Sequence, residues 1–146
     1  MYVWGTANPS GEANEAYKGL YLRHRDIDAF IREMPGKPVK VEHAGPSVGS
    51  VVHAWKNGTN GLDCILEIRK DDSLDGAVIA SLINTKCARE LSLGYRVRMD
   101  MSSATSAHLE KEIVEVSIVK RGMRPDCHIH AFSSPSSLQS ILPSKP

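Results

Sequence analysis

Ser92 is the residue whose setting first suggests chemistry in this chain of 146 residues. It falls on the polar face of a predicted strand beside Gly94, where the missing side chain leaves room for another backbone to approach closely. A hydroxyl group there can serve as a nucleophile if a base and an orienting acid converge on it, and is otherwise an ordinary strand serine. The opposite face of the strand is apolar at every second position. Its residues are Leu91, Leu93, Tyr95, Val97 and Met99.

His43 is the candidate base. It follows a short predicted strand at residues 39–42, and Gly45-Pro46 breaks that strand directly afterwards. Side chains at strand ends and in loops are the ones most easily presented to a substrate. The alternative is a surface or capping histidine with no chemical role.

Glu115 is the candidate acid. It lies between Val114 and Val116 in a predicted strand, so its carboxylate should point away from the core that these valines enter. Glu112, on the opposite parity, is the competing carboxylate. A hydroxyl, an imidazole and a carboxylate are the parts of a Ser–His–acid triad, in which the acid fixes the imidazole tautomer and stabilises the imidazolium. Geometry alone decides whether the three candidates form one.

The spacing of apolar residues predicts two helices and a larger number of strands. The helices are an amphipathic segment at residues 27–34, ended by Pro35-Gly36, and a second segment at residues 73–84. Two helices are too few to supply the crossovers of a parallel sheet. The sequence therefore predicts a β-rich fold (all-β to α+β), a mostly antiparallel closed β-barrel of about six or seven strands with two or more surrounding helices. The predicted strands and extended pieces lie at residues 1–5, 17–22, 39–42, 48–55, 62–68, 91–99 and 114–118.

The amino-acid composition narrows the classes of partner and indicates the domain organisation of the chain. Lys and Arg together number 18 against 17 for Asp and Glu, so no basic field indicates a nucleic-acid partner. No apolar run approaches the roughly 18 residues of a membrane span, so no membrane partner is expected. Three scattered cysteines do not make a disulfide scaffold. We expect one folded domain at residues 1–131 and a Ser/Pro-rich disordered tail or linker at residues 132–146.

Three alternatives assign these residues differently. Cys127, His128 and His130 could ligate zinc, but no second pair with ligand spacing accompanies them, and we expect neither a metal nor another cofactor. A different serine hydrolase, such as an esterase, is disfavoured because Ser92 lacks Gly-x-Ser-x-Gly surroundings. In a non-catalytic alternative the domain is a β-barrel scaffold or binding module, in which Ser92 and His43 are coincidental.

The order of the motifs resembles the herpesvirus capsid maturation protease (assemblin) and the related prohead proteases of tailed phages. The resemblance extends over residues 1–125 and begins with YVWG at residues 2–5, similar to the opening strand of the family. VGSVV at residues 48–52 resembles the strand that follows the family's histidine. ELSLG at residues 90–94 resembles its Leu-Ser-Leu nucleophile strand, and EVSIV at residues 115–119 resembles the Glu-Val-Ser-Leu-Val strand of the phage branch.

The resemblance implies a serine endopeptidase on a β-barrel fold, with residues 1–131 as the protease domain. It implies that Ser92 is the nucleophile and His43 the general base. In the viral family an arginine-bearing loop after the last of these strands helps to build the oxyanion hole. Arg121 matches that position and Arg124 is a second candidate, since positive charge and backbone N–H groups suit a developing oxyanion.

The third member of the triad is where this chain departs from the herpesvirus pattern. Those enzymes use a second histidine, whereas Glu115 has the spacing of the phage-like acid and His108 lies in the loop before the strand. The resemblance also implies a homodimer that cleaves scaffold or capsid precursor protein during virus assembly. The implied location is a viral procapsid inside the host cell, in the bacterial cytoplasm for a phage or in the nucleus for a herpesvirus-like virus.

Overall fold

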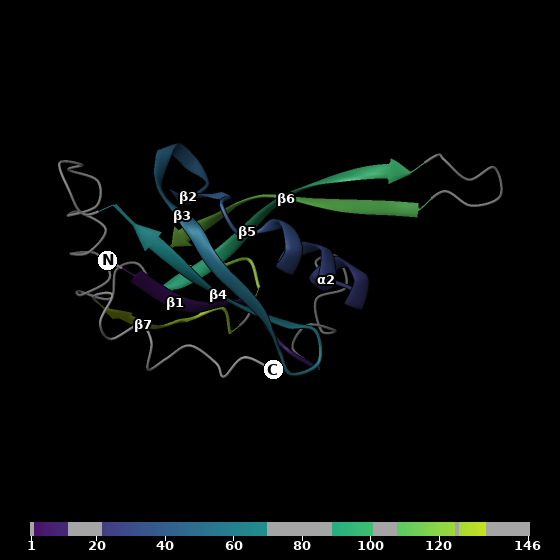
Figure 1. The fold of residues 1–146 in the computed structure, drawn as a ribbon, viewed down its shortest axis with the longest axis horizontal. Coiled ribbons are helices and arrows are strands. Elements are labelled where there is room, and N and C mark those ends of the chain that lie inside the picture. The colour runs from purple at the N-terminus through teal and green to yellow at the C-terminus, as the bar shows by residue number, and fades with distance from the viewer. Residues whose placement is uncertain (1, 12–21, 70–88, 101–107, 125, 134–146) are drawn as a thin grey trace.

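The structure is a computed structural model that describes residues 2–11, 22–69, 89–100, 108–124 and 126–133. These residues form one mixed sheet of seven strands, curled into a half-barrel, with one helix packed against it (Figure 1). The order of strands across the sheet is β5-β6-β2-β3-β4-β1-β7. The elements are β1 (Tyr2–Asn8), α2 (His24–Glu33), β2 (Pro38–Val41), β3 (Ala44–Asn57), β4 (Gly61–Ile68), β5 (Glu90–Asp100), β6 (His108–Val119) and β7 (Ile129–Ser133).

The β-rich class is confirmed and five of the six strand pairings are antiparallel as predicted, but the sheet is mixed and the prediction of a closed barrel is wrong. β2 runs parallel to β6, with Val39 opposite Val116. Three strands separate the two along the chain, so no hairpin turn makes them antiparallel. The described sheet also stays open, because β5 diverges from the body together with β6 (Figure 1). At one end of the sheet, an isolated bridge joins Glu90 of the edge strand β5 to His128, the residue before the other edge strand, β7.

Only one of the two predicted helices lies in the part of the chain that the structure describes. α2 is the one helix that the described residues contain, and it matches the amphipathic helix predicted at residues 27–34. The second helix, predicted at residues 73–84, lies outside the described residues. So does the extended piece at residues 17–22, except for Leu22.

α2 follows from its own residues. The Asp26 carboxylate accepts a hydrogen bond from the Arg23 backbone N–H at 2.8 Å, which caps the first turn. Ile27, Phe30 and Met34 form a single apolar stripe and are fully buried. This stripe packs on β3, β4 and β6, so the helix covers the inside of the half-barrel.

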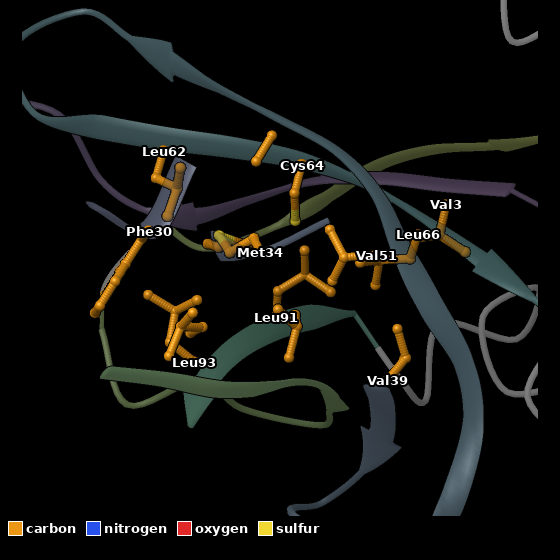
Figure 2. Packing of buried hydrophobic residues seen from close by; sticks show 14 of the residues in the cluster. Val3, Phe30, Met34, Val39, Val51, Leu62, Cys64, Leu66, Leu91 and Leu93 are labelled. Atoms are coloured by element: carbon orange, nitrogen blue, oxygen red, sulfur yellow. The ribbon is translucent and has the colours of Figure 1, made fainter. Parts of the chain in front are cut away.

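The core fills the half-barrel, and β4 contributes to it along most of its length (Figure 2). Ile65 and Asp63 lie on the face of β4 opposite Cys64 and Leu66, yet they are 0% and 3% exposed. Asp63 is tolerated there because Thr6 and Asn57 donate hydrogen bonds to its carboxylate at 2.8 and 3.2 Å. β4 is therefore buried on both faces along most of its length.

β5 and β6 form a long antiparallel ribbon with a β-bulge near its middle. Gly94 pairs with Glu115, but the next pair joins Tyr95 to Ile113, so Val114 is the extra residue of the bulge. Ile113 is buried and Val114 is half buried. The predicted core alternation of β6 is therefore correct from Glu115 onward and is shifted by one residue before it.

The predicted apolar face of β5 is not buried along its whole length. Leu91 and Leu93 are buried as expected, but Val97 is 52% exposed. The outer half of the β5–β6 ribbon projects beyond the body, as Figure 1 shows, so little of the chain covers Val97 there.

The predicted domain boundary falls inside a strand. β7 ends at Ser133, two residues past position 131, and residues 134–146 lie outside the described part of the chain. In the segments that the structure describes, no helix is long and apolar enough to cross a membrane.

Replacing Phe30 by Ala should lower the free energy of unfolding by about 3–5 kcal/mol, because it removes a fully buried aromatic ring and leaves a cavity. Urea unfolding followed by circular dichroism measures this. Val97→Ala on the projecting ribbon is the control and should change the value by about 0.5 kcal/mol or less. Equal losses in the two variants would contradict this placement of the core.

Candidate active site

Ser92 lies in β5 on the face of the sheet opposite the core residues. It pairs with Ser117 of β6, and the next pair on the same face joins Gly94 to Glu115. Leu91 and Leu93, on the other face, are buried in the core. Strand alternation therefore presents a serine hydroxyl and a carboxylate on the same side of the ribbon.

His43 is placed by a two-residue turn between β2 and β3. Val41 pairs with Ala44, and the two residues between them, Glu42 and His43, have φ values of 53° and 58°. Such left-handed turns match the twist of a hairpin but are costly for residues other than Gly, Asn and Asp. The Glu42 N–H donates to the Ile118 carbonyl at 3.2 Å, which ties the turn to β6.

Ser92, His43 and Glu115 form a continuous chain of hydrogen bonds. The Nε2 atom of His43 lies 2.8 Å from Ser92 Oγ, and its Nδ1 atom is hydrogen-bonded to Glu115 Oε1. Because the Glu115 carboxylate accepts the proton of Nδ1, Nε2 is left with a lone pair directed at the Ser92 hydroxyl. The Glu115 residue is 6% exposed, whereas the side chain of His43 is 39% exposed. The Glu115 carboxylate is thus buried, and the His43 imidazole borders the solvent.

Gly94 makes room for the carboxylate of Glu115. A Cβ atom at position 94 would lie 2.0 Å from Glu115 Oε1, the oxygen that binds His43. We expected the space beside Ser92 to admit another backbone, but the Glu115 side chain fills it. The β-bulge next to this pair is typical of positions where a strand redirects a functional side chain.

Glu112 and His108, the competing third members, lie on the outer half of the ribbon. Glu112 pairs with Arg96, and its carboxylate is 3.7 Å from the Arg98 guanidinium. It also lines a cavity of about 350 Å³ between α2 and the ribbon, which includes none of the three hydrogen-bonded residues. The backbone of His108 pairs with Asp100, eight strand positions beyond Ser92, which corresponds to roughly 26 Å along β5.

The loop after β6 lies against the start of β5 and is held by two carboxylates. Glu42 Oε1 accepts the Lys120 N–H and Glu90 Oε1 accepts the Gly122 N–H, both at 2.7 Å. A Cβ atom on Gly122 would lie 2.9 Å from the carbonyl oxygen of Leu91, the residue before Ser92. The loop therefore approaches the candidate nucleophile closely.

The two candidate oxyanion residues of this loop have different surroundings. Arg121 is exposed, and it lies between the two residues whose N–H groups are held by carboxylates. Arg124 is 6% exposed and donates from Nη2 to the Tyr95 hydroxyl at 2.9 Å, with its guanidinium 5.5 Å from the centre of the ring. Arg124 thus ties the loop to β5.

The residues considered for zinc have separate partners. Burial raises the pKa of the Cys127 thiol to about 12, and burial also raises the pKa of Cys64. Neither is a ready thiolate ligand or nucleophile near neutral pH. His128 contacts Glu90, and His130 lies against Thr6, at 2.6 Å from Nε2 to Oγ1. Across the described residues there is no group of three or more His, Cys, Asp or Glu side chains that could hold a metal ion.

Ser117 and Glu42 are polar contacts of the site that the sequence analysis did not single out. Ser117 Oγ donates to Glu115 Oε2 at 2.6 Å and accepts the His43 N–H at 3.0 Å. Ser117 shares the parity of Glu115, which was the available signal in the sequence. Glu42 carried no such signal, since its role depends on the fold of the loop after β6.

Comparison with known proteins shows similarity in structure. No known protein family and no curated protein matches the sequence. A crystal structure of the protease of Kaposi's sarcoma herpesvirus with a hexapeptide phosphonate inhibitor is similar over 95% of this chain and 68% of that one, with a TM-score of 0.60 and 17% identity. The same protease with an allosteric inhibitor is similar over 98% and 83%, with a TM-score of 0.55 and 18% identity. The chain therefore shares the fold of this herpesvirus protease.

Gly94→Ala should break the His43–Glu115 contact, because the new methyl group would overlap the Glu115 carboxylate. We expect loss of the downfield proton NMR signal of the hydrogen-bonded Nδ1–H, with a fall in unfolding free energy of about 1–3 kcal/mol, because a buried carboxylate loses a partner. Glu115→Gln is the reference for complete loss of the charged acceptor. A wild-type signal in Gly94→Ala would show that Gly94 is not needed to place Glu115.

Proposed function

We propose that this protein is a serine endopeptidase with Ser92 as nucleophile, His43 as general base and Glu115 as the orienting acid. The observation that carries the proposal is the hydrogen-bonded chain from Ser92 Oγ through both nitrogens of His43 to Glu115. Buried polar groups are costly in strands, and the convergence of Ser92 and Glu115 from two strands with His43 from a strained turn is typical of a functional site. The shared fold of a viral protease supports the same conclusion.

The geometry supports acyl transfer in two stages. His43 Nε2 removes the proton of Ser92 as Oγ attacks the carbonyl carbon of the peptide, and the resulting imidazolium is stabilised by Glu115. The imidazolium then gives that proton to the departing amine, which leaves an acyl-enzyme on Ser92. A water molecule, deprotonated by the same nitrogen, hydrolyses the ester and regenerates the hydroxyl.

The loop after β6 is the proposed oxyanion site. The N–H groups of Lys120 and Gly122 are already held by Glu42 and Glu90, which fix the peptide units on either side of Arg121. In this proposal the Arg121 N–H is the donor to the developing oxyanion. Arg124, held on Tyr95, fixes the far end of the loop and adds positive charge.

An extended peptide suits the surroundings of Ser92. β5 is an edge strand of the described sheet, and beyond its contact with residues 127–129 its outer edge has no strand partner among the described residues. A peptide can add to such an edge through its backbone, which favours a peptide over a small ester as substrate. The similar herpesvirus protease binds a hexapeptide phosphonate inhibitor.

The biological setting is proposed from the same likeness. The substrate would be scaffold or capsid precursor protein in a viral procapsid, cleaved by a homodimer. The third member is a carboxylate with the phage-like spacing, which favours a bacteriophage over a herpesvirus-like virus as the source of this protein. A scaffold or binding module of a capsid is the non-catalytic alternative, and it predicts no hydrolysis.

A library of fluorogenic peptides incubated with the purified chain tests the function. We expect cleavage of a subset of sequences, with cleavage abolished in Ser92→Ala. Self-cleavage detected by mass spectrometry would identify a preferred sequence directly. Cleavage that persists in Ser92→Ala, or none in the wild type toward library or capsid precursor, would contradict the proposal.

Glu115→Gln should lower kcat/KM for the best library peptide by roughly 10²- to 10⁴-fold, because a buried amide can favour the wrong imidazole tautomer. Glu112→Gln is the matched control, since it changes a carboxylate of the same strand that pairs with Arg98 instead. His108→Ala should likewise leave the rate near that of the wild type. A strong loss in His108→Ala with normal turnover in Glu115→Gln would show that the third member is a histidine.

A further inference from the structure

We propose that Ser117 is a positioning residue of this site, which holds His43 and Glu115 in the relative orientation that their hydrogen bond requires. The inference rests on the proposed serine peptidase function. Ser117 lies in β6 directly opposite Ser92 and is 0% exposed. A fully buried serine in a strand needs partners for its hydroxyl group, and both partners of Ser117 belong to the site.

The single proton of the Ser117 hydroxyl determines the direction of both bonds. Oγ lies 2.6 Å from Glu115 Oε2, and an ionised carboxylate can only accept, so Ser117 donates there. The His43 backbone N–H, 3.0 Å away, can only donate, so Ser117 accepts from it. One hydroxyl therefore joins the side chain of the acid to the backbone of the base, with no conflict between the two bonds.

The bond to Glu115 fixes which carboxylate oxygen serves the imidazole. Ser117 occupies Oε2, so Oε1 is the oxygen that faces His43 Nδ1. The Glu115 residue is 6% exposed, which leaves little access for water to replace a lost donor. Without Ser117 the carboxylate would lose a charge-assisted hydrogen bond and the restraint on its rotation, and the Nδ1–H tautomer would be held less firmly.

The bond to His43 holds the turn that carries the base. His43 has a φ of 58°, a conformation that persists when neighbouring structure stabilises it. The Ser117 hydroxyl holds its N–H, and the adjacent Ile118 carbonyl accepts the N–H of Glu42. Successive residues of β6 thus hold both residues of the turn, which sets the height of the imidazole above Ser92.

The experiment compares Ser117→Ala with the wild-type chain by two measurements. A fluorophosphonate probe reports the rate at which Ser92 is labelled, and we expect this rate to fall about 10- to 100-fold, the effect of one hydrogen bond to a charged group. Nitrogen-15 NMR of the imidazole reports the tautomer, and we expect a mixture in place of the Nδ1–H form. The labelling rate should also fall in Ser117→Cys, because a thiol is of similar size but is a weak hydrogen-bond donor.

Thr6→Val is the matched control. Thr6 is also buried, at 7% exposure, and donates to a buried carboxylate, that of Asp63, at 2.8 Å, but it contacts no residue of the site. Its labelling rate and tautomer should equal those of the wild type. An equal loss in Thr6→Val would mean a general loss of structure and would overturn the inference.

Two further outcomes separate this inference from the proposed function. If Ser117→Ala is labelled at the wild-type rate and keeps a single tautomer, Ser117 has no positioning role although the peptidase proposal stands. If the wild type is not labelled at Ser92, the peptidase proposal fails. The tautomer of His43 in Ser117→Ala then decides the structural role of Ser117 by itself, and an unchanged Nδ1–H form would overturn it.

Discussion

The pairing of β6 with a different strand on each of its edges is the constraint on which the site depends. On one edge β5 runs antiparallel and places Ser92 opposite Ser117. On the other edge β2 runs parallel and places Lys40 opposite the same Ser117, so the turn after β2 brings His43 over this position. A slip of one residue in the pairing of β5 would turn Ser92 toward the core and break the contact with His43.

The site concentrates features that destabilise a fold in isolation. Ser92, Glu115 and Ser117 are polar residues at 4%, 6% and 0% exposure in strands, and Glu42 and His43 occupy left-handed backbone conformations. Each cost is reduced by a specific partner, since the Ser92 hydroxyl bonds to His43, the Ser117 hydroxyl bonds to Glu115, and the turn bonds to β6. The apolar core on the opposite face of the same strands supplies the stability that keeps these groups in place.

Strand alternation is a local property, which is why the sequence placed Ser92 and Glu115 on the face away from Leu91 and Val116. The position of His43 above them depends on the parallel pairing of β2 with β6, and no periodicity in a single segment encodes a pairing between distant strands. The bulge at Val114 was equally hidden, because a valine fits either a regular strand or a bulge. The prediction of a closed barrel failed for the same reason, since closure depends on how edge strands meet.

In the proposed mechanism, His43 activates the Ser92 hydroxyl. The most direct test is to treat the purified chain with a fluorophosphonate and locate the adduct by peptide mass spectrometry, in the wild type and in His43→Ala. We expect one adduct, on Ser92, that forms in the wild type and is lost in His43→Ala while a folded spectrum is retained. An unmodified Ser92 in the wild type, or equal modification in both proteins, would contradict it.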